Sequence, residues 1–367
     1  MPNHPTLIKP PPANDNRSPI EDVLELTHLE DIDPNLFTNT RPLWHPPGAR
    51  GIYGGAVIAQ CLAAAQRTVP ENFSVHSMHC YFVLNGNADI PLIYHVENVR
   101  QGRSFATRTV QARQRGQPIF TTTISFMKEG SGGVKKAEHA AHMPTVPDPI
   151  SEEELESMTS INGPLLSQRI GITNNDSPHL HEKRTRQWIK ARGRISDGGG
   201  HEAHLSALAY MSDSYFIGTV ARVHKLWRYS TNSRKDNASG RKEMGGITPD
   251  VIRKLKALDH STLSRMQGMD EDVIDQLKSL EINEKDEIVF KEKRPEIGMM
   301  VSLDHTIYFH SPKGFRADEW LFTECESPWS GDGRGLVLQK MYTREGLLVA
   351  TCVQEVSLTV SASVMWV

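Results

Sequence analysis

The chain has 367 residues, of which 38% are hydrophobic and 23% charged, and its formal net charge is −3. This length suits one large domain or two ordinary ones. Lys and Arg are interspersed with acids rather than clustered, which argues against a nucleic-acid-binding protein. No run of about 18 apolar residues is present, so we expect no membrane insertion. The Pro- and Asn-rich residues 1–21 lack the apolar centre of a signal peptide and are predicted to form a disordered lead.

Two parts of the chain, residues 22–129 and 184–367, follow the same plan. Each has a Gly-rich turn before a helix of small residues, then a strand that ends in an aromatic pair, then two strands joined by a short turn. A long helix followed by an antiparallel meander, present twice, predicts an α+β fold with internal duplication. The expected helices are 56–67 and 201–217, and the expected strand pairs are 104–114 with 117–127 and 333–343 with 347–358.

Two further segments lie outside this plan. Residues 130–183 begin with a Gly-rich stretch and are predicted to be a linker. Residues 227–295 interrupt the second copy, and their apolar spacing predicts helices at Pro249–Ala257 and Asp270–Leu280. We expect this insertion to be a solvated helical excursion; a docking or lid role is the alternative.

Gln354 lies where an apolar side chain is expected. In a strand, alternation places it on the same face as Ala350, Cys352 and Val356. A buried amide without partners costs roughly 1–3 kcal/mol, so a polar group should meet it there. The alternative is a core amide bound to nearby backbone.

Two other polar residues stand out in the second copy. Asp213 lies on the flank of the apolar stripe of the helix 201–217, where it can point into a crevice. Ser302 lies on a predicted strand, on the face shared by Asp304 and Thr306. An ordinary half-exposed aspartate and an ordinary strand serine are the alternatives. The first copy has no acid on its helix and has Val75 in the place of Ser302.

Several other signals are weak. His201 and His204 are one residue short of the zinc spacing H-E-x-x-H, so we expect no metal. No G-x-S-x-G elbow, P-loop or G-x-G-x-x-G is present, and no cofactor is expected. The four cysteines lie singly in apolar segments and are predicted to be reduced core thiols, with Cys352 as a minor candidate nucleophile.

Several short blocks of sequence match a known family when taken in order. They are Tyr53–Gln60, Val75–Phe82, Gly102–Arg108 and Pro118–Phe120 in the first copy, and Leu208–Asp213, Ser302–His305, Asp318–Leu321, Gly346–Ala350 and Gln354–Glu355 in the second. Each block alone is weak, but their order is specific. With them the chain resembles the acyl-CoA thioesterase II family, whose members are double hotdog proteins, and its insertion is similar to that of longer fungal members.

The resemblance implies a double hotdog fold, in which each of two tandem repeats is a long helix wrapped by an antiparallel sheet. It also implies a catalytic set of Asp213, Ser302 and Gln354. Asp213 would act as general base or would orient a water that Ser302 and Gln354 hold. The implied reaction is hydrolysis of fatty acyl-CoA to free fatty acid and CoA by direct attack of water, without a cofactor.

The resemblance also suggests where substrate binds and how the chain assembles. Gly55, Arg103, Arg108 and Arg334 are the substrate-binding candidates, the arginines for the phosphates of CoA. Ala56 stands where the family usually has Gln, which puts a contribution of the first copy to catalysis in doubt. We expect a homodimer or higher homo-oligomer in the cytoplasm or the peroxisomal matrix, although the last three residues do not form an S-K-L signal.

Three other functions remain open from the sequence. The first is a non-catalytic acyl-CoA-binding or scaffold protein that acts through residues 227–295. The second is a thioester hydrolase dedicated to a biosynthetic pathway. The third is a hotdog dehydratase or hydratase, which the absence of a D-x-N-P-x-H signature disfavours.

Overall fold

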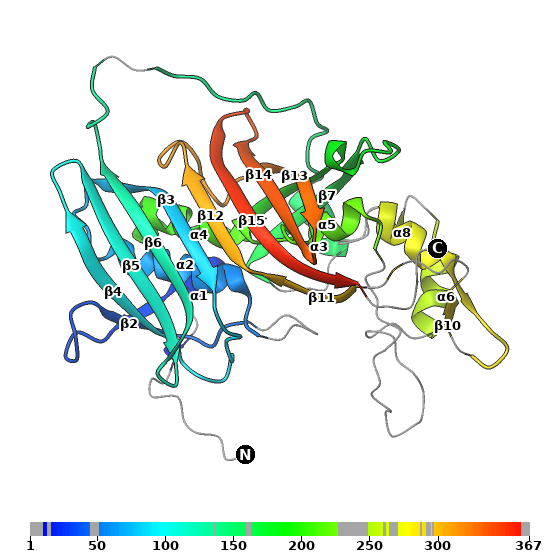
Figure 1. Ribbon diagram of the computed structural model, residues 1–367, viewed down its shortest axis with the longest axis horizontal. Coiled ribbons are helices and arrows are strands. Elements are labelled where there is room, and N and C mark those ends of the chain that lie inside the picture. The colour runs from blue at the N-terminus through cyan, green and yellow to red at the C-terminus, as the bar shows by residue number, and fades with distance from the viewer. Residues whose placement is uncertain are drawn as a thin grey trace.

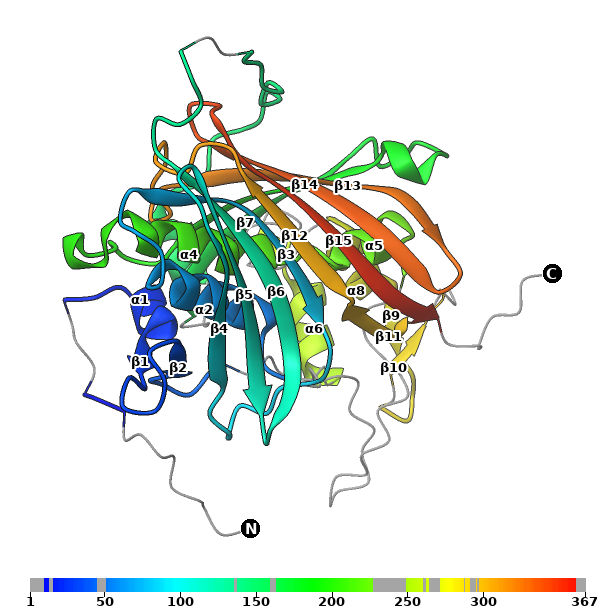
Figure 2. The same ribbon diagram turned by 60° about the vertical axis from the view of Figure 1, so that its left-hand side comes forward.

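A computed structural model of the protein describes residues 10–12, 16–44, 51–134, 137–158, 163–226, 249–259, 262–263, 271–286, 288–290, 295 and 297–360. Within these residues a single antiparallel sheet runs through both copies, in the order β1-β2-β4-β5-β6-β3-β12-β15-β14-β13-β8-β7, and β11 pairs with β15. The sheet curves around two central helices, α2 and α4 (Figures 1 and 2). This is the double hotdog arrangement that the sequence predicted.

The elements of the first copy are α1 (Pro19–Leu24), β1 (Leu26–His28), β2 (Leu36–Asn39), α2 (Gly54–Gln66), β3 (Phe73–Phe82), β4 (Ile93–Gln101), β5 (Phe105–Gln114) and β6 (Gln117–Lys128). The segment between the copies contains α3 (Glu152–Met158) and β7 (Leu165–Thr173). The short helix η1 (Leu180–Glu182) precedes the second copy, which contains β8 (Arg184–Ala191), η2 (Asp197–Gly199), α4 (Gly200–Ser212), α5 (Gly218–Val223), β11 (Ile297–Ser302), β12 (Asp304–Phe309), β13 (Leu321–Gly331), β14 (Arg334–Thr343) and β15 (Leu348–Val360). Its insertion contains α6 (Pro249–Ala257), α8 (Glu271–Ser279), β9 (Leu280–Ile282) and β10 (Ile288–Phe290).

The central helices α2 and α4 have 13 residues each and lie side by side in opposite directions. At one end the Tyr53 hydroxyl donates to the Tyr210 carbonyl (3.0 Å), and at the other the Ser206 hydroxyl donates to Gln66 Oε1 (2.9 Å). Both helices are largely buried and rich in small residues, which allows their backbones to approach closely. The N-terminus of each central helix therefore lies near the C-terminus of the other.

The two copies are related by a local two-fold axis between β3 and β12. These strands pair antiparallel with His79 opposite Thr306. Alignment of the aromatic pairs that end the two strands, Tyr81 with Tyr308, makes each residue of β3 equivalent to the residue 227 positions later in β12. His79 and Thr306 are then equivalent and also directly opposite each other, as a two-fold axis between them requires. His79 pairs with Thr123 of β6, and Thr306 pairs with Val353 of β15, so Thr123 and Val353 are equivalent. The residues that follow them, Ile124 and Gln354, are therefore also equivalent.

Three predicted boundaries are corrected by the structure. The helix expected over 201–217 ends at Ser212, because Tyr215 adopts a left-handed backbone (φ 59°) that no α-helix contains. The segment expected to be a linker up to residue 183 contains α3 and β7, and β7 joins the sheet beside β8. The lead expected up to residue 21 already contains the start of α1, whose Ile20 is fully buried.

The helices predicted in the insertion are present as α6 and α8, and Ile274 and Leu277 are buried. Residues 227–248, the first part of the predicted insertion, lie outside the described residues. Among the residues that the structure describes, no helix has the length and apolar character that a membrane span requires.

Candidate active site

Asp213 lies immediately after α4, at its C-cap position. Its carboxylate reaches the N-terminus of α2 in the other copy, where it accepts a hydrogen bond from the backbone N–H of Gly55. The positive end of the α2 dipole favours a negative charge at this place. A carboxylate of the second copy is thus held by the helix of the first copy.

Glycine is needed where α2 begins beside this carboxylate. A Cβ added to Gly54 would come within 2.9 Å of Asp213 Oδ2, and one added to Gly55 would come within 2.5 Å of the Tyr210 carbonyl oxygen. Both distances are shorter than any normal van der Waals contact. The Gly-Gly pair therefore lets the helix end approach Asp213 and the end of α4.

Burial and hydrogen bonding act on Asp213 in opposite directions. Asp213 keeps partial contact with solvent but is surrounded by protein, and this burial raises its pKa to about 6, while the hydrogen bonds from Gln354 and Gly55 lower it. A carboxylate with this pKa is mostly ionised at neutral pH and is more basic than an ordinary aspartate. It is therefore suited to take a proton from water.

Gln354 is fully buried on the inner face of β15, and its Nε2 donates to Asp213 Oδ1 at 3.0 Å. The polar partner that the sequence required for this amide is therefore Asp213. Gln354 Oε1 has no hydrogen-bond partner within the described residues. This oxygen can accept a hydrogen bond from a water beside the carboxylate.

Ser302 is the last residue of β11 and lies opposite Val356 of β15. Residues directly opposite in an antiparallel pair share a face, so Ser302 faces the same side as Gln354, about 7 Å away as a diagonal neighbour. Strict alternation in the sequence predicted that Ser302 faces the same side of the sheet as Thr306, and this prediction is wrong. The register shifts by one residue between Ser302 and Thr306 on their common partner β15, and such a shift moves a side chain to the other face.

The counterpart of this site in the first copy has none of its polar groups. The residue that follows α2 is Arg67, where α4 is followed by Asp213. Val75 and Ile124 correspond to Ser302 and Gln354, and both are buried. A carboxylate and an amide are therefore available at only one of the two related positions.

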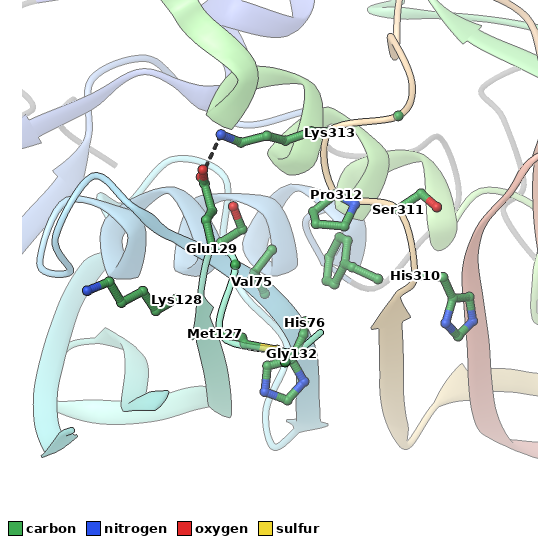
Figure 3. Close-up of a pocket in the computed structure, with 15 residues that line it drawn as sticks. Val75, His76, Met127, Lys128, Glu129, Gly132, His310, Ser311, Pro312 and Lys313 are labelled. Atoms are coloured by element: carbon green, nitrogen blue, oxygen red, sulfur yellow. Dashed lines mark ion pairs between the residues drawn. The ribbon is translucent and has the colours of Figure 1, made fainter. Parts of the chain in front are cut away.

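A groove of about 580 Å³ opens beside Val75, between the start of β3 and the end of β12 (Figure 3). Val75 and Phe309 are among the residues that line it. Lys313 forms an ion pair with Glu129 (2.5 Å) at its edge (Figure 3). The groove and the Asp213 site thus lie at opposite ends of the β3–β12 pair. The groove contains neither Asp213 nor Gln354, and Glu129, the carboxylate in its wall, is paired with Lys313.

The four predicted substrate contacts fall into different places. Gly55 lies in the site, through its N–H bond to Asp213. Arg103 is exposed in the short connection between β4 and β5. Arg334 lies opposite Ser357 on the outer face of the sheet, pairs with Glu355 (2.9 Å) and therefore points away from Gln354.

Arg108 is not available for a phosphate group. It is 1% exposed, and its guanidinium donates to the side chain and carbonyl of Thr68, to Gln101 Oε1 and to the carbonyls of Arg100 and Thr107. These bonds tie the strand β5 to the end of α2. The structure therefore assigns Arg108 a structural role in place of the predicted substrate contact.

Some residues of the site were not predicted. Gly54 and Tyr53 were predicted only as parts of a Gly-rich helix start and of a block that matches the family. The Tyr53 hydroxyl donates to the Tyr210 carbonyl, and the centres of the two rings lie 4.8 Å apart. Gln187 and Gln339 are buried beneath Asp213 as well. Their signal was available, because each is an amide on the apolar face of an alternating strand, as Gln354 is.

Family models match both halves of the chain: the acyl-CoA thioesterase N-terminal domain over residues 41–127 and the acyl-CoA thioesterase C-terminal domain over residues 140–358. The chain belongs to the acyl-CoA thioesterase II family. As a member of the acyl-CoA thioesterases it is a thioester hydrolase, and its double hotdog fold is that of the family.

Curated relatives of this thioesterase align over nearly their whole length. It is 32% identical to the human acyl-coenzyme A thioesterase 8, over 94% of this chain and 90% of that protein. It is 35% identical to the peroxisomal acyl-coenzyme A thioester hydrolase 1 of Saccharomyces cerevisiae, over 92% and 93%. Among solved structures, the acyl-CoA thioesterase II TesB2 of Mycobacterium marinum is similar with a TM-score of 0.60 and 26% identity, over 95% of this chain and 99% of that one.

Proposed function

We propose that this thioesterase hydrolyses fatty acyl-CoA by direct attack of a water molecule that Asp213, Gln354 and Ser302 position. One observation carries the proposal. The carboxylate of Asp213 is held by Gln354 from the sheet and by the N-terminus of α2, and burial raises its pKa to about 6. This arrangement supports a general base that remains ionised at neutral pH.

In the proposed reaction Asp213 takes a proton from the water, and the hydroxide adds to the carbonyl carbon of the thioester. The bond between this carbon and the sulfur then breaks, which leaves the free acid. The proton passes from Asp213 to the departing thiolate of CoA. No covalent enzyme intermediate is needed, because a thioester carbonyl is electrophilic enough for direct hydrolysis.

Each neighbour of Asp213 has a role in this step. Gln354 donates to Asp213 through Nε2, so its Oε1 is free to accept a hydrogen bond from the attacking water. The Ser302 hydroxyl faces the same side and is close enough to bind that water through a bridging contact. The positive end of α2 polarises the carbonyl as it gains negative charge, an effect that has been worth about 10²–10³ in rate where single donors were removed.

Release of thiol from acyl-CoA by purified protein tests this proposal, with variants at symmetry-related positions as a matched pair. We expect Asp213→Asn to reduce kcat at least about 100-fold in a folded protein. Gln354→Leu should also reduce kcat, whereas Ile124→Leu, the same product residue at the counterpart in the first copy, should leave it within about twofold.

Turnover near the wild-type rate in Asp213→Asn would sink the assignment of the site. A wild-type protein that binds acyl-CoA without releasing thiol would instead support the non-catalytic binding function. The same assay over acyl groups of graded length defines which fatty acyl-CoA is preferred. Arg103, exposed beside β4 and β5, is the remaining arginine proposed to contact the phosphates of CoA, and Arg103→Ala should raise KM rather than lower kcat.

We propose a homodimer, to be tested by light scattering during gel filtration, which should give twice the mass of the 41.1 kDa chain. A single chain mass at micromolar concentration would contradict it. The yeast relative is named peroxisomal, which supports the peroxisomal matrix over the cytoplasm as the compartment. Imaging of a tagged protein beside a peroxisomal marker distinguishes these two locations.

A further inference from the structure

Three buried glutamines from three strands lie beneath the turn that follows α4. They are Gln187 on β8, Gln339 on β14 and Gln354 on β15, and they are 5%, 1% and 0% exposed. We refer to them as the glutamine cluster. Their depth is unusual, because glutamine is rarely found fully buried unless its amide is paired.

The cluster forms a diagonal line across the inner face of the sheet. Gln339 lies opposite Cys352, two residues from Gln354 on the same face of β15. Gln187 lies opposite Thr323, which is opposite Met341, two residues from Gln339 on the same face of β14. With strands about 4.8 Å apart, the line spans three strand spacings, or about 14 Å across the strands, and it also shifts by four residues along them.

The two ends of this line are fixed to consecutive residues of one turn. Gln354 Nε2 donates to Asp213 Oδ1 (3.0 Å), and Gln187 Nε2 donates to the Ser214 carbonyl (3.3 Å). Between these bonds, four amide atoms have no nitrogen or oxygen partner within the described residues. They are Gln187 Oε1, Gln339 Oε1, Gln339 Nε2 and Gln354 Oε1. The Gln339 amide lies beside the Cys325 thiol.

The first copy shows that the fold does not require polar groups here. Because Gln354 corresponds to Ile124, Cys352 corresponds to Thr122, two residues earlier on each strand. Gln339 pairs with Cys352 and Val110 pairs with Thr122, so Val110 is the counterpart of Gln339. The same ladders make Phe37 the counterpart of Gln187, through Tyr94. Ile124, Val110 and Phe37 are at most 1% exposed. The glutamines therefore occur only in the copy that contains Asp213.

A small cavity lies at the outer end of the cluster. Gln187, Thr323, Cys325 and Tyr215 are among the residues that line it, and it offers about 10 Å³ of room for the centre of a water molecule. That volume suits about one water and is far too small for an acyl chain. Tyr215, at its edge, has the left-handed backbone (φ 59°) and carries the guanidinium of Arg169 over its ring at 4.3 Å.

We propose that the glutamine cluster holds a chain of buried water molecules whose inner end is the water that Asp213 activates. The four amide atoms offer three acceptors and one donor group, and the cavity that Gln187 and Tyr215 line has room for about one water. This inference rests on the proposed function, because it names where the attacking water comes from.

Gln339→Met tests the chain, because methionine has nearly the same shape and no strong hydrogen-bonding group. We expect kcat for acyl-CoA hydrolysis to fall about 10-fold while KM changes less than twofold, since Gln339 touches neither Asp213 nor the proposed position of the thioester. Met341→Leu, on the same face of the same strand, is the volume-conserving control and should leave both constants unchanged. If Gln339→Met does not fold, Gln339→Leu provides the comparison at the same position.

A crystal structure at about 1.5 Å gives a readout that is independent of hydrolysis. We expect ordered waters bonded to Gln187, Gln339 and Gln354 in the wild type, and their loss around position 339 in Gln339→Met. A dry cluster in the wild type, or a Gln339→Met enzyme with kcat within twofold of the wild type, would overturn the inference. Full activity in Asp213→Asn would instead overturn the proposed function, while the waters would still be visible.

Discussion

At the scale of single residues, Asp213 illustrates how a fold can raise the basicity of a carboxylate and still keep it hydrogen-bonded. Its surroundings favour the protonated acid, and the bonds from Gln354 and Gly55 favour the carboxylate; burial is the larger effect and raises the pKa to about 6. The unfolded chain has an ordinary aspartate with a pKa near 3.8. Between these two values the native state binds a proton that the unfolded state has lost, so stability falls as the pH rises from about 4 to about 6.

This difference predicts that Asp213→Asn is more stable than the wild type at neutral pH. A shift of about two pKa units corresponds to about 3 kcal/mol, and the partial contact of Asp213 with solvent reduces this to on the order of 2 kcal/mol. Urea unfolding of both proteins at pH 4 and pH 7.5 measures it. The free energies of unfolding should nearly coincide at pH 4 and differ at pH 7.5; equal stability at both pH values would show that burial does not raise the pKa of Asp213.

At the scale of secondary-structure elements, the N-terminus of α2 connects the two copies at the site. The Gly54-Gly55 pair sets how closely the helix approaches Asp213, Tyr210 and the ring of Phe82. The long helix and the hairpin of each copy could be predicted from the sequence. The hairpins follow from local signals, namely alternation of period two in the strands and turn glycines such as Gly116 (φ 77°). The end of α4 at Ser212 and the register shift beyond Ser302 were not, since both depend on backbone geometry that side-chain alternation does not encode.

Gly54→Ala is expected to disturb the site through this helix end. The added methyl group would lie 2.7 Å from the Phe82 ring and 2.9 Å from Asp213 Oδ2, so the helix or the carboxylate must move. We expect kcat to fall at least about 10-fold and the free energy of unfolding to fall by about 1–3 kcal/mol. Gly132→Ala is the control, because its Cβ would meet only Met127 Cε at 3.9 Å; equal rates for the two variants would contradict the packing argument.

The Arg108 guanidinium gives a second prediction at this scale. Arg108→Met leaves buried acceptors at the end of α2 and in β4 without their donor, so we expect the free energy of unfolding to fall by on the order of 3 kcal/mol. KM for acyl-CoA should not change, since the side chain is 1% exposed. Thermal denaturation and steady-state kinetics on one preparation separate the two roles, and a raised KM with unchanged stability would restore Arg108 as a phosphate contact.

At the scale of the whole molecule, duplication has produced one polar site from two related halves. The absence of an acid and a hydroxyl in the first copy was visible in the sequence, because the helix 51–68 has no carboxylate and Val75 replaces Ser302. What the sequence could not show is that Asp213 is held by the first copy's helix, because that contact depends on the pairing of β3 with β12. Strand β7 was missed for the same reason, since its role appears only beside β8.

The central claim is that Asp213 activates a water and does not itself attack the thioester. Single-turnover hydrolysis in H₂¹⁸O, with enzyme in excess over acyl-CoA and mass spectrometry of the products, tests it most directly. We predict that the fatty acid from the first turnover carries one ¹⁸O atom and that Asp213 remains unlabelled. Unlabelled fatty acid from the first turnover, together with ¹⁸O in the Asp213 carboxylate, would show a covalent anhydride and contradict the account.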